Sequence, residues 1–138
     1  MNSQEYRDFL LSVPRTAKIA TVREDGRPHV APIWFDLDNE IIVFTTWHTT
    51  VKAANLLRDP RVSLCVDDDK PPFAFVIVDA VASFDQDAGH LAYWARRIAG
   101  RYMGPDLADS YGRRNSVEGE LLVRLTPIKV TAKKGISD

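Results

Sequence analysis

Short hydrophobic runs, each bounded by polar turn residues, make up most of the chain. The runs are rich in β-branched and aromatic residues, a composition typical of β-strands. We expect strands at residues 16–23, 29–36, 41–46, 61–66, 73–84 and 120–133. The long, valine-rich run Phe73–Phe84 predicts a strand that is buried on both faces. Asp25-Gly26, between the first two runs, is a strong signal for a hairpin.

Three other stretches repeat apolar residues at helical spacing and predict helices at 2–13, 49–58 and 86–102. Asn2 and Glu5 have the spacing of a capping box. The polar stretch 103–118 has room for further helical turns. Strands joined by short turns favour an antiparallel sheet, and six of them fit a small barrel without exposed edges. We therefore expect a mainly β (α+β) chain with helices that flank the barrel.

Length, charge and composition narrow the class of protein. The 138 residues are enough for one domain, and nothing divides residues 1–138 into two. The 18 basic and 19 acidic side chains give a net charge of −1, which argues against a nucleic-acid partner. Neither a signal peptide nor an apolar run of the roughly 18 residues that cross a membrane is recognised. We expect a cytoplasmic protein with no membrane partner.

Several common kinds of site are not indicated by the sequence. It has no dinucleotide-binding, P-loop, serine-hydrolase or zinc-protease motif. His29, His48 and His90 lie far apart, and Asp67–Asp69 lacks the alternate spacing of a calcium loop. Cys65 alone excludes an internal disulfide. We expect no metal site, and no side chain stands out as an obligatory catalytic acid or base.

The segment Thr45–Leu56 joins a strand to a helix and carries several hydroxyls and one lysine at the junction. A helix start offers free backbone N–H groups and positive dipole density to an anion. Thr49, Thr50 and Lys52 there form a cradle that suits one phosphate group. The alternative is a threonine N-cap beside an exposed lysine, since threonine caps are common.

The segment His29–Phe35 offers a second candidate surface. Pro32 removes a hydrogen-bond donor and bends the strand, so nearby backbone amides are left unpaired. Ile33 and Trp34 add planar apolar surface on which a flat heteroaromatic ring fits. The alternative is that Trp34 and Phe35 alternate between the core and a subunit interface.

Together these segments resemble the pyridoxamine 5'-phosphate oxidase-like family. The resemblance rests on Asp25–Val30, Pro32–Phe35 and Val51–Val62, and it covers most of the chain, most weakly at 85–118. Its most specific part is Lys-x-x-Asn-Leu followed by Arg-Asp-Pro-Arg, which is similar to the branch of the family that uses the deazaflavin coenzyme F420. The family's fold is the FMN-binding split β-barrel, which implies six antiparallel strands with flanking helices.

The resemblance also implies a homodimer with the cofactor in two grooves between the subunits. Lys52 and the hydroxyls near Thr50 would face the phosphate, and Asn55 would support the phosphate turn. The ring would be bordered by Pro32, Ile33, Trp34, Phe44, Thr45 and Thr46. The long helix would cover the groove, or enter it from the other subunit, with Trp94, Arg97 and Arg101. A solvated helix face is the alternative for both arginines.

The implied function is that of an oxidoreductase that transfers a hydride between reduced coenzyme F420 and a small activated unsaturated or quinone-like acceptor. A lone Lys52 suits the singly charged phosphate diester of that coenzyme better than the monoester of FMN, which carries about −1.5 to −2. The alternatives are an FMN-dependent oxidoreductase of the same fold and a non-catalytic protein that binds a flavin, a deazaflavin or haem. His48 and Tyr102 are candidate proton donors if they lie near the ring.

Overall fold

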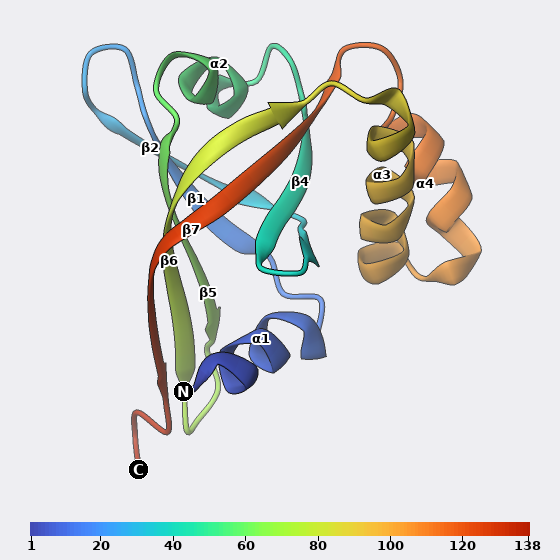
Figure 1. Ribbon diagram of the computed structural model, residues 1–138. Helices are drawn as coiled ribbons and strands as arrows, with labels where there is room; N and C mark the ends of the chain where they lie inside the picture. Colours follow the sequence, from blue (N-terminus) through green and yellow to red (C-terminus); the bar gives the residue numbers. More distant parts are fainter.

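The computed structural model describes residues 1–138 and confirms a mainly β fold with flanking helices (Figure 1). The strands are β1 (Ala17–Val22), β2 (Pro28–Ile33), β3 (Asp36–Asp38), β4 (Ile41–Trp47), β5 (Arg61–Asp68), β6 (Ala74–Asp85) and β7 (Glu120–Lys134). The helices are α1 (Ser3–Ser12), α2 (Val51–Arg58), α3 (Ala88–Met103), the short η1 (Pro105–Leu107) and α4 (Ala108–Arg114). All strand pairs are antiparallel, and one sheet runs in the order β2-β1-β5-β6-β7-β4-β3.

Seven strands form where the sequence predicted six, because the segment 29–36 divides into two. Strand β2 pairs with β1, whereas β3 pairs with β4. Trp34 and Phe35 form the corner between them, and this corner carries the chain from one edge of the sheet to the other. Pro32 lies on the edge strand β2, a position where proline is tolerated.

Strand β6 is buried on one face only, so the prediction of burial on both faces was wrong. Val76, Val78 and Ala80 are buried, whereas Asp79 and Val81 are exposed. Valine-rich runs are buried on both faces in parallel sheets that helices cover on both sides. Here the sheet is antiparallel, and along β6 only its inner side meets the core, so the side chains of this strand alternate between core and solvent.

Two hydrophobic clusters hold the molecule together. The inner side of the sheet encloses the main core of 17 buried residues, which includes Phe35 and Phe44, both with 0% exposure. A second cluster lies on the outer side of β4 and β7, where α3 packs, and consists of Val43, Trp94, Ile98 and Leu122. Helices α3 and α4 lie side by side next to the barrel (Figure 1). This packing places the long helix beside the end of β4.

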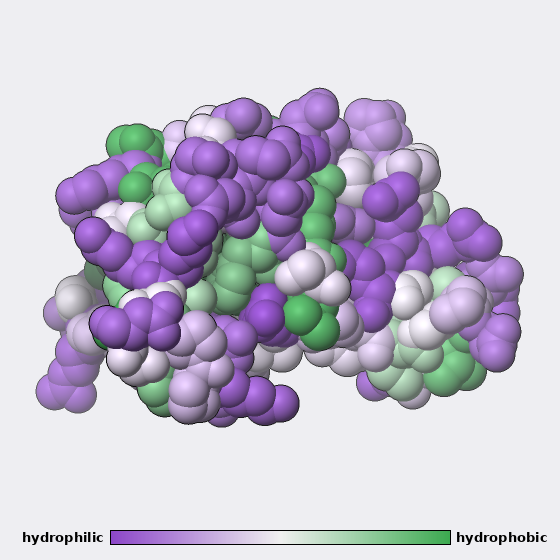
Figure 2. Space-filling model, turned by 90° about the horizontal axis from the view of Figure 1, so that it is seen from below, coloured by the Kyte–Doolittle hydropathy of each residue, from purple (hydrophilic) through white to green (hydrophobic).

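Helix α1 covers the lower end of the barrel in Figure 1. The predicted capping box is confirmed: the Asn2 side chain accepts from the Glu5 backbone N–H at 2.8 Å, and the Glu5 carboxylate accepts from the Asn2 N–H at 3.3 Å. The view of this end in Figure 2 shows a largely hydrophilic surface with hydrophobic residues gathered near its middle. A membrane-spanning helix is not found among the elements.

The close approach of α3 and α4 depends on Gly112. A Cβ atom at this position would lie 2.8 Å from the Arg96 Cα atom. We expect Gly112→Ala to push the helices apart and to lower the free energy of unfolding by about 1–3 kcal/mol, which chemical denaturation measures. Gly100→Ala is the matched control, because its Cβ would meet only Ala108 at 3.5 Å and alanine favours a helix. Equal losses of stability in both variants would contradict this explanation.

Candidate functional site

A cavity of about 310 Å³ lies on the outer side of the barrel, where the end of β2, β4, the start of α2 and α3 meet. Its lining residues are Thr16, Pro32, Ile33, Trp34, Thr45, Lys52, Ile98 and Asn115. Five of them, Pro32, Ile33, Trp34, Thr45 and Lys52, are residues that the sequence put forward as cofactor contacts. The structure therefore brings the two candidate segments, 29–35 and 45–56, to one place.

Trp34 gives the cavity an aromatic wall that Tyr102 supports from behind. The rings of Trp34 and Tyr102 stack with centroids 5.0 Å apart and an angle of 1° between their planes. The Tyr102 hydroxyl donates to the Arg15 carbonyl at 2.7 Å and accepts from the Phe35 N–H at 3.3 Å. Burial raises the pKa of Tyr102. Its proton is thus committed to a backbone carbonyl, which leaves Tyr102 as a support for Trp34 and not as a free proton donor.

Thr50 is the N-cap of α2, which confirms the capping alternative for this residue. Its hydroxyl accepts from the Ala53 N–H at 3.3 Å and donates to the Trp47 carbonyl at 3.0 Å. Since a hydroxyl has one proton, the Thr46 hydroxyl must donate to Thr50 across 2.8 Å. These bonds fix the first turn of α2, and with it the direction in which Lys52 leaves the helix.

Lys52 is the only charged side chain among the residues that line the cavity. It takes part in none of the ion pairs of the molecule. Burial lowers the pKa of its ammonium, and the more distant carboxylate of Glu120 raises it in part. A half-buried cation without a close counter-ion is costly, so this end of the cavity is suited to an anionic group.

Asn55 holds α2 against the barrel from behind the cavity. Its buried side chain donates to the Thr21 hydroxyl at 3.0 Å and accepts from Arg58 at 3.3 Å. The residue does not line the cavity. It supports the helix that carries Lys52, which is a supporting role of the kind that the family resemblance implied, although the side chain points to β1.

The remaining candidates are not brought to the cavity. In β4 only Thr45 faces it, because Phe44 and Thr46 point to the inner side of the sheet and are buried. Thr49 is exposed on the turn before α2. The long-helix candidates make other contacts within this chain: Trp94 is buried in the outer cluster, Arg97 pairs with Asp36 at 3.4 Å, and Arg101 donates to the Phe35 and Leu10 carbonyls.

Sequence reasoning missed three lining residues and one nearby acid. Ile98 belongs to the apolar face of the long helix, where nothing marks one residue as special. Thr16 and Asn115 carried no signal, since their places depend on the tertiary fold. Glu120, at the start of β7, lies near Lys52; burial raises its pKa, while Arg114, Lys52 and His48 lower it in part. The cavity thus has a mixed charge environment.

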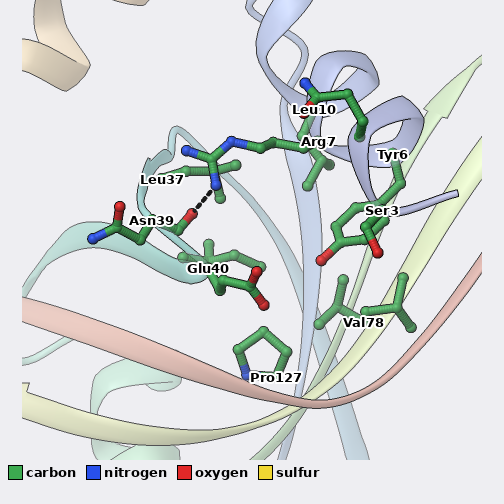
Figure 3. Close-up of a pocket in the computed structure, with 12 residues that line it drawn as sticks. Ser3, Tyr6, Arg7, Leu10, Leu37, Asn39, Glu40, Val78 and Pro127 are labelled. Atoms are coloured by element: carbon green, nitrogen blue, oxygen red, sulfur yellow. Dashed lines mark hydrogen bonds between the residues drawn. The ribbon is translucent and has the colours of Figure 1, made fainter.

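A second cavity, of about 360 Å³, lies between α1 and the barrel and contains none of the predicted site residues (Figure 3). Its floor includes Val78 and Pro127, and its rim carries Tyr6, Arg7 and Glu40. An Arg7 N–H donates to the Asn39 carbonyl at 2.8 Å, so part of this cation is already used to fasten α1. The cavity with Lys52 combines an unpaired, half-buried cation with the ring of Trp34 and with the residues that the sequence put forward, which makes it the candidate site.

Comparison with known proteins identifies the family. Residues 3–134 match the family model described as pyridoxamine 5'-phosphate oxidase, and the chain belongs to this family. A comparison with curated protein sequences finds no match. The fold is therefore the split barrel of that family, with helices on its flanks.

Several solved structures are similar over nearly the whole chain. The conserved hypothetical protein Rv2991 from Mycobacterium tuberculosis is 28% identical, with a TM-score of 0.87 over 99% of this chain and 87% of that chain. An F420 reductase is 25% identical, with a TM-score of 0.70 over 90% of this chain and 94% of that chain. HutZ, the haem storage protein of Vibrio cholerae, is 23% identical and shares the fold, with a TM-score of 0.76 over 99% and 98% of the two chains.

Proposed function

We propose that the protein is an oxidoreductase that uses reduced coenzyme F420 to reduce a small activated unsaturated or quinone-like acceptor. The observation that carries this proposal is that one cavity is lined both by the unpaired cation of Lys52 and by the stacked ring of Trp34. Such a cavity suits a ligand with a flat ring and an anionic group. The F420 reductase at 25% identity supports the choice of coenzyme.

Each part of the cavity has a role in this proposal. Pro32, Ile33 and Trp34 border the ring, Thr45 offers a hydroxyl beside it, and Lys52 holds the phosphate. The coenzyme, when bound, supplies the hydride. The residues supply position and an apolar wall that excludes water from one side of the ring. Because the Tyr102 proton is engaged, water or a residue of the partner supplies the proton to the acceptor.

The charge of the site favours a phosphate diester. A diester carries one negative charge, whereas a phosphate monoester such as that of FMN carries about −1.5 to −2 at neutral pH. Lys52 is one cation, and no arginine lines the cavity. Lys52 therefore balances the single charge of a diester, whereas a monoester would keep an unbalanced negative charge in the cavity.

We also propose a homodimer in which the partner borders the cofactor. On the outer side of the sheet, Val30 of β2 and Ile128 of β7 are exposed to 67% and 70%, and a hollow of about 570 Å³ is lined by Ile128 and by residues of β1, β5 and β6. Pro32 follows Val30 by two residues and therefore faces the same side of the edge strand. Since Pro32 also lines the cavity, a second copy on this face would complete the wall of the cavity.

Charged substitutions on this face are expected to break the dimer. Val30→Glu and Ile128→Glu each place a charge in the apolar contact, which is costly without a partner charge. Light scattering coupled to size exclusion should give the mass of two chains for the wild type and of one chain for the variants. Leu107→Glu is the control, because Leu107 is also exposed, at 42%, but lies on η1. A monomeric wild type would contradict the proposal.

Binding of the anionic ligand is expected to weaken at alkaline pH. Lys52 attracts the phosphate only while it is protonated, that is, below its pKa. Burial lowers that pKa, so the loss should begin at lower pH than for an ordinary lysine with a pKa of about 10.4. Titrations across an alkaline pH series measure the change, and Lys52→Met should remove it. A pH dependence that persists in this variant would assign it to another group.

The proposed function is tested by titrating the protein with coenzyme F420 and with FMN in parallel, read by quenching of the tryptophan fluorescence. We expect tighter binding of coenzyme F420 and turnover of its reduced form with quinone or enone acceptors. Preference for FMN would move the protein to FMN-dependent chemistry. Tight binding without turnover would indicate a carrier, and binding of neither ligand would overturn the proposal.

A further inference from the structure

Glu120 lies at the start of β7, near Lys52. It pairs with Trp47 across β7 and β4, and Leu122, two residues further, pairs with Thr45. Cross-strand partners face the same side of a sheet, and so do residues two apart in a strand. Glu120 therefore shares the outer face with the cavity-lining Thr45, displaced toward the turn from which α2 and Lys52 begin.

The Glu120 carboxylate is half-buried and takes part in none of the side-chain hydrogen bonds or ion pairs of the molecule. Three basic residues lie near enough to interact with its charge: Arg114 of α4, Lys52 of α2 and His48 in the turn after β4. Burial raises the pKa of Glu120, and these three groups lower it in part. Glu120 lines a neighbouring hollow and not the cavity of Lys52, so its carboxylate can affect a ligand in that cavity only through its charge.

We propose that Glu120 limits the charge of the ligand that the Lys52 cavity accepts, so that a singly charged phosphate diester is favoured over a doubly charged monoester. This inference rests on the proposed function, because it concerns the same cavity and the same phosphate. It adds Glu120 as a residue that determines specificity, because its charge makes the affinity depend on the charge of the phosphate group.

The argument follows from the charges near the phosphate position. Lys52 attracts a phosphate, and Glu120 repels it in proportion to the charge that the phosphate carries. The cost of taking an anion out of water rises with its charge as well. For a doubly charged phosphate, the attraction to Lys52 and the repulsion from Glu120 both double, so Glu120 cancels part of the added attraction. The desolvation cost grows more steeply, with the square of the charge, and the cavity lining supplies no second cation to offset it.

The same physics gives a quantitative relation to test. The Coulomb energy between Glu120 and the ligand doubles from a monoanion to a dianion. Removing the Glu120 charge must therefore leave a neutral ligand unaffected. It must increase the affinity for a monoanion by some factor, and the affinity for a dianion by about the square of that factor. A merely structural effect of the substitution would change all three ligands alike.

The experiment uses Glu120→Gln and three flavins that share one ring system: riboflavin, the methyl ester of FMN, and FMN. Riboflavin has no phosphate and is neutral at pH 8, whereas the phosphate of the methyl ester carries one charge and that of FMN about two. We expect the variant to bind riboflavin unchanged, the methyl ester about threefold more tightly and FMN about tenfold more tightly than the wild type. Coenzyme F420 is titrated alongside as the reference ligand of the site.

Two further variants separate charge from fold. Glu120→Asp keeps the charge and should retain the discrimination of the wild type. Glu118→Gln removes an exposed carboxylate two residues earlier and should leave all three affinities nearly unchanged. The melting temperatures of the variants establish that each one is folded.

The outcomes are distinguishable. The role of Glu120 would be overturned if Glu120→Gln changed the affinities for the three flavins equally, or did not increase the affinity for FMN. Neither outcome would affect the proposal that the cavity binds coenzyme F420. If FMN binds too weakly to detect in the wild type, its binding must appear in Glu120→Gln, and its absence from both overturns the inference. Failure of coenzyme F420 and of all flavins to bind any of the proteins would overturn the proposed function and this inference together.

Discussion

Replacing Lys52 with methionine is expected to weaken the binding of coenzyme F420 by about 10- to 150-fold. A hydrogen bond to a charged group contributes about 1.5–3 kcal/mol, and each 1.4 kcal/mol changes an affinity tenfold. No other charged residue lines the cavity, so no neighbour can replace the lost cation. Methionine keeps an apolar stem of similar length, which preserves the packing of the half-buried side chain. Tryptophan quenching measures the change in dissociation constant.

Two controls make this result specific. Lys52→Arg keeps the charge and should lose less affinity than Lys52→Met, because only the shape of the cation changes. Lys70→Met removes an exposed lysine from the loop between β5 and β6, and should leave the affinity unchanged. If Lys52→Met binds the coenzyme as tightly as the wild type, Lys52 does not hold the phosphate.

The parts of the site that lie within one short segment could be predicted from the sequence. Pro32 and Trp34 were recognised because proline and tryptophan have distinctive chemistry within a strand pattern. Lys52 was recognised because it follows a hydroxyl-rich strand end at the start of a helix. In each case the signal lies within a few residues, and the fold then places both segments beside one cavity.

The parts that depend on distant partners could not be predicted in the same way. Arg101 is charged and lies on a helix, so its residue type favoured a solvated face, while the family resemblance implied a ligand contact. Its role is decided by carbonyls of Phe35 and Leu10, which precede it by 66 and 91 residues. Asn115 likewise reaches the cavity only because α4 packs on α3. Contacts between residues so far apart in the sequence leave no signal in the local sequence pattern.

Phe44 and Thr45 show how one position in a strand separates core from site. The family resemblance placed both beside the ring, but neighbouring residues of a strand face opposite sides of the sheet. Phe44 is fully buried in the main core, and Thr45 lines the cavity. The strand pattern alone did not decide which side faced the cofactor, since both sides of β4 are covered: one by the core, the other by α3.

This difference leads to a large expected effect on stability. Phe44→Ala should lower the free energy of unfolding by about 3–5 kcal/mol, because it leaves a cavity where a fully buried ring was packed. The affinity of the remaining folded protein for coenzyme F420 should change little, since Phe44 does not reach the cavity. Chemical denaturation gives the first quantity, and titration of the folded fraction gives the second.

Thr45→Val is the matched comparison, and we expect it to reduce ligand affinity and not stability. The substitution keeps the shape of the side chain and removes a hydroxyl that faces the cavity. Stability should change little, whereas affinity should fall about two- to tenfold if the hydroxyl bonds the ligand, as for one neutral hydrogen bond. A stable Phe44→Ala that loses the ligand would return Phe44 to the site and reverse the two faces of β4. The pair of variants therefore tests the orientation of the strand on which the whole cavity depends.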